Sequence, residues 1–158
     1  MPPCVLTEED GRDGLFPRPH VAPPPAAGQR VQLSFRPEPR RVAEMRRMAA
    51  TALDCAGLLD PDVAGAVELL VSELVTNAVT HSPGGLVFFS LVCDAADKVR
   101  IEVADHSPGT PVVRHPGPDA ENGRGMLLVS ALASAWGTTP LPTGKQVWAE
   151  LPGGGCDR

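Results

Sequence analysis

The segment from Asp62 to Ser82 constrains the fold more than any other part of the chain, because it predicts one long amphipathic helix. Asp60 and Pro61 predict its start, as an N-cap residue followed by a proline in the first helical position. The Ser-Pro-Gly-Gly sequence at 82–85 predicts its end. Its apolar residues recur at helical spacing and form a broad stripe that another layer must cover: Val63, Val67, Leu70, Val71, Leu74 and Ala78.

The same helix carries three polar residues on one side. Glu73, Asn77 and His81 are spaced at i, i+4 and i+8, so their side chains project in one direction. An asparagine is unexpected in a purely structural helix, because its amide competes with the backbone for hydrogen bonds. From spacing alone a solvated polar face is favoured over a binding site, and His81 serves equally well as a cap of the helix end.

Composition places the chain among single-domain proteins of a reducing compartment. Its 158 residues suit one domain, and its net charge of −5 weighs against bulk nucleic-acid binding and against an anionic membrane surface. It has no run of 18 apolar residues and no secretory signal at its start, so we expect a cytoplasmic protein. Its cysteines form no CxxC pair, and we expect Cys55 and Cys93 to be small core residues.

Three regions are expected along the chain. Residues 1–29 are rich in proline and glycine and predict a disordered leader, with a proline-rich ligand as the less favoured alternative. Residues 30–152 predict the folded domain, and residues 153–158 a flexible tail. The domain shows this order of patterns: strand 30–35, helix 40–56, the helix described above, strand 86–93, strand 98–105, helix 125–135 and strand 145–151.

These patterns predict an α+β fold, a two-layer sandwich with helices on one face of a largely antiparallel mixed sheet. Within it, Trp136 and Gly137 are expected to end the third helix, with a short strand before a turn at 140–144. The third helix is expected to bury Leu128, Leu132 and Ala135. Four arginines between Arg40 and Arg47 predict either a solvated helix face or a nucleic-acid or partner contact, and the acidic net charge favours the former.

Four polar or glycine-bearing places remain to be explained together. They are Glu73 with Asn77, Asp105 with Gly109, the Gly-Arg-Gly sequence at 123–125, and Gly144 with Lys145. The Gly-Arg-Gly sequence has a direct physical meaning, because unpaired backbone N–H groups at a helix start attract an anion and glycine lets it approach closely. A phosphate-bearing ligand is therefore expected at this place. A loop of about eighteen residues precedes this helix, a length typical of lids and binding loops.

Together these places resemble the GHKL-type nucleotide-binding family of gyrase, a heat-shock chaperone, histidine kinases and DNA mismatch-repair ATPases. ELVTNAVTHS is similar to the family's N box, VADHSPGTP to its aspartate-glycine box, GRGMLLV to its second glycine box and GKQVWAEL to its closing element. Within the family, the chain looks most like the anti-sigma-factor serine kinases and small ATP-binding regulators of high-GC actinobacteria. The resemblance covers about Leu33 to Leu151 and implies a Bergerat-type ATP-binding fold.

The resemblance implies a role for each matching residue. Asn77 would ligate a Mg²⁺ ion that bridges the phosphates of ATP, and Asp105 would accept a hydrogen bond from the adenine amino group. Glu73 would be the general base that takes a proton from a serine hydroxyl or from water. The remaining matches would contact the nucleotide: Gly109 and the loop to Asn122 as a lid, Gly123, Arg124, Gly125 and Met126 around the phosphates, and Lys145 in the closing element.

The sequence departs from the family pattern at Ser107, where the first glycine of the aspartate-glycine box is expected. Because serine has a Cβ, we expect it to restrict the backbone, crowd the purine and weaken ATP affinity.

The resemblance implies a regulatory kinase that uses ATP and Mg²⁺ to phosphorylate a serine on an antagonist protein and controls a sigma factor. The alternative is a non-catalytic module in which nucleotide binding changes partner affinity. A nucleic-acid-binding regulator that uses the arginine face is a third reading and the least favoured. The resemblance also allows a homodimer built on the first strand and helix.

Overall fold

The computed structural model describes residues 28–94, 98–108 and 124–154. Its elements, in chain order, are β1 (Gly28–Phe35), α1 (Arg40–Ala56), α2 (Pro61–His81), β2 (Val87–Asp94), β3 (Lys98–Asp105), α3 (Arg124–Leu132), β4 (Ala135–Leu141) and β5 (Gly144–Pro152). β1 begins two residues before the strand expected from the sequence. The predictions for the leader up to residue 27, for the long loop and for the tail after residue 154 lie outside the described residues.

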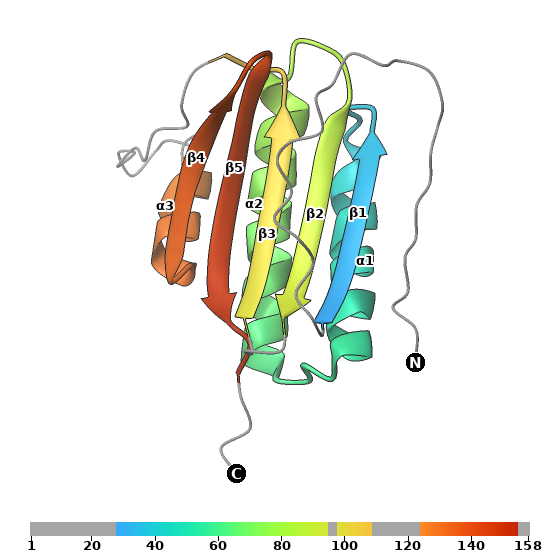
Figure 1. The fold of residues 1–158 in the computed structure, drawn as a ribbon, viewed down its shortest axis with the longest axis vertical. Coiled ribbons are helices and arrows are strands. Elements are labelled where there is room, and N and C mark those ends of the chain that lie inside the picture. Colours follow the sequence, from blue (N-terminus) through green and yellow to red (C-terminus); the bar gives the residue numbers. More distant parts are fainter. Residues whose placement is uncertain (1–27, 95–97, 109–123, 155–158) are drawn as a thin grey trace.

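The five strands form one sheet in the order β1-β2-β3-β5-β4, and all four pairings between neighbours are antiparallel. All three described helices lie against the same face of this sheet (Figure 1). This arrangement confirms the predicted two-layer α+β fold. The β2–β3 and β4–β5 pairs are joined by short connections, whereas α1 and α2 separate β1 from β2, and α3 and β4 separate β3 from β5.

The core lies between the sheet and the helices. Alternate residues of the strands face the helix layer and are buried, as the two-residue period of a strand requires: Val31, Leu33 and Phe35 in β1, Val87, Phe89, Leu91 and Cys93 in β2, Val99, Ile101 and Val103 in β3, and Val147, Ala149 and Leu151 in β5. The helix α2 supplies seven buried residues, including the whole predicted stripe. It packs against α1, α3 and three of the five strands, so it is the central element of the helix layer.

The predicted boundaries of α2 are confirmed by its caps. The Oδ1 atom of Asp60 accepts a hydrogen bond from the backbone N–H of Asp62 at 2.9 Å, and Pro61 occupies the first turn. Before α2, Gly57 ends α1 in the left-handed conformation (φ 73°), which suits a residue without a Cβ. These caps fix the angle between α1 and α2 and thereby the face that α2 turns towards the sheet.

The helix α2 is also long and apolar enough to cross a membrane by length and composition alone, with a mean hydropathy of 1.4. No other helix among the described residues meets this criterion. In the fold, its apolar stripe packs against the sheet and against α1, which accounts for the hydropathy.

The structure corrects the prediction for the segment after the third helix. Instead of continuing to Ala135, α3 ends at Leu132, and Ala135–Leu141 forms the strand β4. Trp136 and Gly137 lie within this strand rather than ending a helix, and Pro140 pairs with Lys145 rather than opening a turn. Because β4 is an edge strand, the missing N–H of Pro140 interrupts no ladder on its outer side.

Two burial predictions are also wrong. The buried residues of α3 are Met126 and Val129, while Leu128 and Leu132 are half-buried and Ala135 is exposed. The stripe is rotated because α3 lies at the side of α2, above the edge strand β4, and presents a different face to the core.

Cys55 is exposed rather than a core residue, whereas Cys93 is buried as predicted. Burial and the neighbouring Asp94 raise the pKa of the Cys93 thiol to about 11, so it stays protonated.

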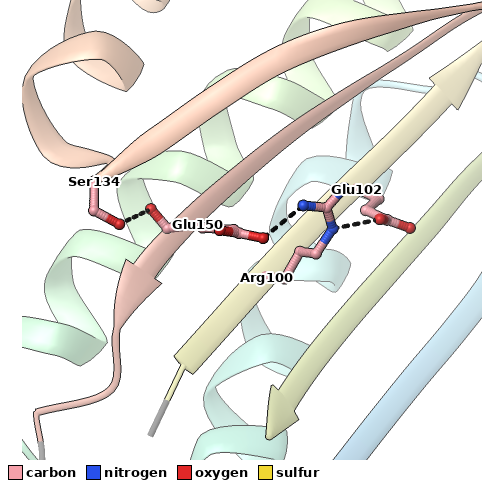
Figure 2. Close-up of polar contacts among 4 residues, drawn as sticks. All are labelled: Arg100, Glu102, Ser134 and Glu150. Carbon is pink, nitrogen blue, oxygen red and sulfur yellow. Dashed lines mark hydrogen bonds and ion pairs between the residues drawn. The ribbon is translucent and has the colours of Figure 1, made fainter. Parts of the chain in front are cut away.

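The sheet face opposite the helices carries a polar network (Figure 2). Arg100 of β3 donates to Glu102 at 2.6 Å and to Glu150 of β5 at 2.7 Å, and its guanidinium lies 4.4 Å from the centre of the Trp148 ring. Partial burial works against the charge, but these hydrogen bonds raise the pKa of Arg100 above its usual value. The network ties β3 to β5 on this face and buries Glu102.

Ion pairs occupy part of the arginine face of α1. Arg40 pairs with Glu38 at 2.5 Å and Arg41 with Glu44 at 2.8 Å, while Arg46 approaches Ser72 of α2 at 3.5 Å. This arrangement is that of a solvated helix face with local charge pairing. The nucleic-acid reading of this face stays a prediction.

The fold predicts a contrast between two neighbouring leucines of α2. Leu70 has no exposed surface and Leu69 is 45% exposed. We expect Leu70→Ala to lower the free energy of unfolding by about 3–5 kcal/mol, because it removes a core side chain and leaves a cavity. The matched change Leu69→Ala should cost about 0.5 kcal/mol or less. Urea unfolding followed by circular dichroism measures both, and equal effects would contradict the position of α2 in the core.

Candidate functional site

The candidate site lies at the end of the sheet where β3 stops and β5 begins. Asp105 is the last residue of β3 and stands directly opposite Lys145, the second residue of β5. Both continue the helix-facing rows of their strands, after Val103 and before Val147. Their exposed fractions are 3% and 7%, so a carboxylate and an ammonium group lie buried at the upper edge of the core.

Ser107 connects these two charges. Its backbone N–H donates to Oδ1 of Asp105 at 2.7 Å, and its hydroxyl donates to the same oxygen through a short hydrogen bond. The Nζ atom of Lys145 donates to the Ser107 hydroxyl at 2.7 Å. Lysine, serine and aspartate therefore form one directed chain of hydrogen bonds, in which each bond polarises the next.

The turns around this chain are packed closely against it. A Cβ on Gly144 would collide with the backbone carbonyl oxygen of Asp105, so only glycine fits at the start of β5. His106 lies within hydrogen-bonding distance of the carbonyl oxygen of Thr143, with its Nδ1 atom 3.1 Å away. A Cβ on Gly85 would come within 2.5 Å of the His106 ring. The β4–β5 turn and the segment after α2 thus enclose the end of β3.

The polar residues of α2 form the second part of the site. Glu73 and Asn77 are half-buried and His81, the last residue of the helix, is exposed. The Glu73 carboxylate lies against the start of α3, because a Cβ on Gly125 would collide with its Oε2 atom. The structure therefore brings together two of the places singled out in the sequence, the carboxylate of α2 and the glycine of α3.

The other predicted site residues have different outcomes. Met126 is buried and its side chain belongs to the core, so only its backbone remains available to a ligand. Arg124 is the first residue of α3, and its side chain lies outside the described part. Gly109 and Gly123 fall outside the described residues, as does the loop to Asn122.

No group of three or more His, Cys, Asp or Glu side chains within residues 28–94, 98–108 and 124–154 could hold a metal ion. The sequence resemblance makes Asn77 the residue that would hold a magnesium ion. The half-exposed amide of Asn77 suits an ion that keeps most of its waters and takes its other ligands from phosphates.

Sequence reasoning missed the role of Ser107. The family pattern made it a departure that would crowd the site, whereas the structure buries its hydroxyl between Asp105 and Lys145. A signal was present, because aspartate two residues before serine favours a turn in which the carboxylate accepts a backbone N–H. The cross-strand register that brings in Lys145 was not readable from the sequence.

The family of the chain follows from its sequence as a whole. The family described as "Histidine kinase-like ATPase domain" matches residues 35–151, which is most of the chain, so the protein belongs to this family. The match begins at the last residue of β1 and ends one residue before the last of β5, and so covers the two-layer fold. The description implies ATP binding, and the resemblance to GHKL-type ATPases is thereby confirmed at the level of the family.

The chain also has matches among solved structures. One similar structure is the histidine kinase domain from Erythrobacter litoralis EL346 blue-light activated histidine kinase, 28% identical over 58% of this chain and 45% of that chain, with a TM-score of 0.44. This chain matches less than half the length of that structure. No curated protein matches the chain.

The described residues fit a nucleotide. Asp105 is a buried carboxylate with acceptor capacity, and the contact of Gly125 with Glu73 leaves no room for a side chain at the start of α3. Unpaired backbone N–H groups at a helix start suit a phosphate.

The close approach of Gly144 to Asp105 is testable by itself. We expect Gly144→Ala to destabilise the fold by about 1–3 kcal/mol, because the new methyl group collides with backbone rather than with a movable side chain. Gly65→Ala is the matched control: Gly65 is exposed within α2 with nothing within 4 Å of an added Cβ, and it should gain up to about 1 kcal/mol. Thermal and urea unfolding measure both, and a neutral Gly144→Ala would argue against this packing.

Proposed function

We propose that this protein is a regulatory serine/threonine protein kinase that binds ATP and Mg²⁺, phosphorylates an antagonist protein and controls a sigma factor. The observation that carries the proposal is the presence of two separate carboxylates. Asp105 is a buried acceptor at the end of β3, and Glu73 of α2 lies against the start of α3. One group suits recognition of a purine and the other suits proton transfer. Membership of the ATPase domain family supports the nucleotide, and the sequence resemblance supports the choice of substrate and partner.

In this proposal the residues at the sheet end bind the base. Asp105 accepts a hydrogen bond from the 6-amino group of adenine, and the backbone around Ser107 and Gly144 shapes the pocket wall. Hydrogen bonding to a fixed acceptor distinguishes adenine from guanine, whose 6-position is itself an acceptor. Lys145 contributes positive charge beside the base rather than a contact to the phosphates, since its ammonium donates to Ser107.

The residues of α2 and α3 act at the phosphate end. The backbone N–H groups at the start of α3 and the Arg124 cation would bind the phosphates, and Asn77 would hold Mg²⁺. ATP supplies the phosphoryl group that is transferred. Glu73 takes the proton of the attacking serine hydroxyl, and its place beside Gly125 keeps the carboxylate next to the phosphate-binding helix start.

The proposed cell compartment is the cytoplasm, where ATP, a sigma factor and its antagonist are found together. The partner surfaces are not identified by these residues, and the proposed antagonist and sigma factor rest on the sequence resemblance. A homodimer remains part of the proposal on the same ground. Direct binding of nucleic acid is not part of it, because the net charge is −5 and part of the arginine face is paired.

The adenine contact is tested by calorimetric titration of Mg-ATP into the full chain and into Asp105→Asn. Both Ser107 donors already bond to Oδ1, so the amide oxygen of asparagine would bond to them and leave its NH₂ group towards the adenine amino group. We expect affinity to fall by about 100-fold or more.

The matched control is Asp54→Asn, an exposed aspartate of α1, which should bind ATP as the unchanged chain does. Absence of ATP binding by the unchanged chain would overturn the proposed nucleotide site, and full binding by Asp105→Asn would remove Asp105 from it.

The role of Glu73 is tested by single-turnover phosphotransfer to candidate antagonist proteins, followed by phosphoserine detection. Glu73→Gln should retain ATP affinity within a few-fold and lose about 10²–10⁴ in rate, because glutamine cannot take the hydroxyl proton. Glu68→Gln, an exposed position of the same helix, is the control. A full rate in Glu73→Gln would exclude Glu73 as the base. Complete absence of phosphoserine with retained ATP binding would favour a non-catalytic module.

A further inference from the structure

The feature that carries a further inference is the hydrogen-bond chain from Lys145 through Ser107 to Asp105. Both hydrogen bonds to the Asp105 carboxylate end at Oδ1. Among the residues that the structure describes, none donates a hydrogen bond to the other oxygen, Oδ2. The carboxylate is thus held by one oxygen, and the second remains an acceptor.

Burial gives this arrangement its effect. Asp105 and Ser107 are each 3% exposed and Lys145 is 7% exposed, so water competes little for these groups. Lys145 stands directly opposite Asp105 on β5, and its ammonium is linked to the carboxylate through the Ser107 hydroxyl. The two donors at Oδ1 fix the orientation of the carboxylate, and a carboxylate oxygen accepts hydrogen bonds.

An acceptor-only group selects among purines by the substituent at the 6-position. The 6-amino group of adenine donates to it, whereas a 6-oxo group places a second acceptor against the carboxylate and a 6-hydrogen offers no hydrogen bond. The strength of this selection depends on how firmly the carboxylate is oriented. In this chain the orientation depends on Ser107, which bonds to Oδ1, and on Lys145, which bonds to the Ser107 hydroxyl.

We propose that Ser107 and Lys145 are positioning residues that lock Asp105 as an acceptor and so set the selectivity of the pocket for a purine bearing a 6-amino group. The inference rests on the proposed nucleotide-binding function. It reverses the expectation from the sequence, because the serine that replaces a glycine strengthens adenine recognition instead of crowding the base.

The test compares two ligands on the full chain by calorimetry, ATP and purine riboside 5′-triphosphate, which has hydrogen in place of the 6-amino group. The ratio of their dissociation constants isolates the 6-amino contact from contacts to ribose and phosphates. For the unchanged chain we expect ATP to bind about tenfold to 100-fold more tightly, as a hydrogen bond to a charged group implies. In Ser107→Ala and Lys145→Met the ratio should fall to about threefold or less, and in Asp105→Asn to about one or below, because the asparagine NH₂ group then faces the adenine amino group.

Matched controls separate positioning from general damage. Ser72→Ala, at a serine of α2 whose hydroxyl bonds to the backbone of Glu68, and Lys98→Met, at the exposed lysine of β3, should keep the ratio of the unchanged chain. Lys145→Arg keeps the positive charge and should preserve more of the ratio than Lys145→Met. Circular dichroism melting checks that each variant is folded. If Lys145→Met fails to fold, Ser107→Ala decides the test, because it removes only one oxygen atom.

The outcomes are distinct. A lowered ratio in Ser107→Ala with controls unchanged supports the inference. An unchanged ratio in folded Ser107→Ala overturns it and leaves the proposed nucleotide site standing, and so does tighter ATP binding by Ser107→Gly, which would mean that the serine crowds the base. If the unchanged chain binds neither ligand, the proposed function fails, and this inference fails with it.

Discussion

The packing of α2 is the constraint on which the rest of the structure depends. Its apolar stripe is buried against the sheet, it packs also against α1 and α3, and Glu73 lies at the border between α2 and α3. A helix that is packed on three sides moves little, so it can hold a carboxylate in a nearly fixed position. The same burial that stabilises the domain therefore gives the candidate site its geometry.

The two ends of the candidate site are built by different physical means. At the sheet end, a buried carboxylate, a hydroxyl and an ammonium satisfy one another, and the glycine at the start of β5 lets the two strands approach closely. At the helix end, Glu73 and Asn77 are half-buried on α2, and the Glu73 carboxylate lies against Gly125 of α3. The first end is held by hydrogen bonds between side chains, and the second by the packing of two helices.

The sequence predicted those features whose cause is local. The N-cap at Asp60 and the apolar stripe of α2 depend on neighbouring residues, and both are found in the structure. Features that depend on tertiary packing were missed: the strand at Ala135–Leu141, because Pro140 is tolerated only at a sheet edge, and the burial of Met126 and Val129, because α3 turns another face to the core. For the site, motifs located Asp105, Glu73 and Asn77, but only the β3–β5 register relates Lys145 to Ser107.

That register has a consequence for how the molecule folds. β2 with β3, and β4 with β5, are hairpins whose loops close at little entropic cost, whereas Asp105 and Lys145 lie on strands that meet only after α3 and β4 have been placed. Contacts between distant parts of a chain tend to form late and to slow folding. The hydrogen-bond chain at the sheet end consequently depends on pairing between two strands that are distant in the sequence. A nascent chain that has formed only its hairpins therefore lacks the contact between Lys145 and Ser107.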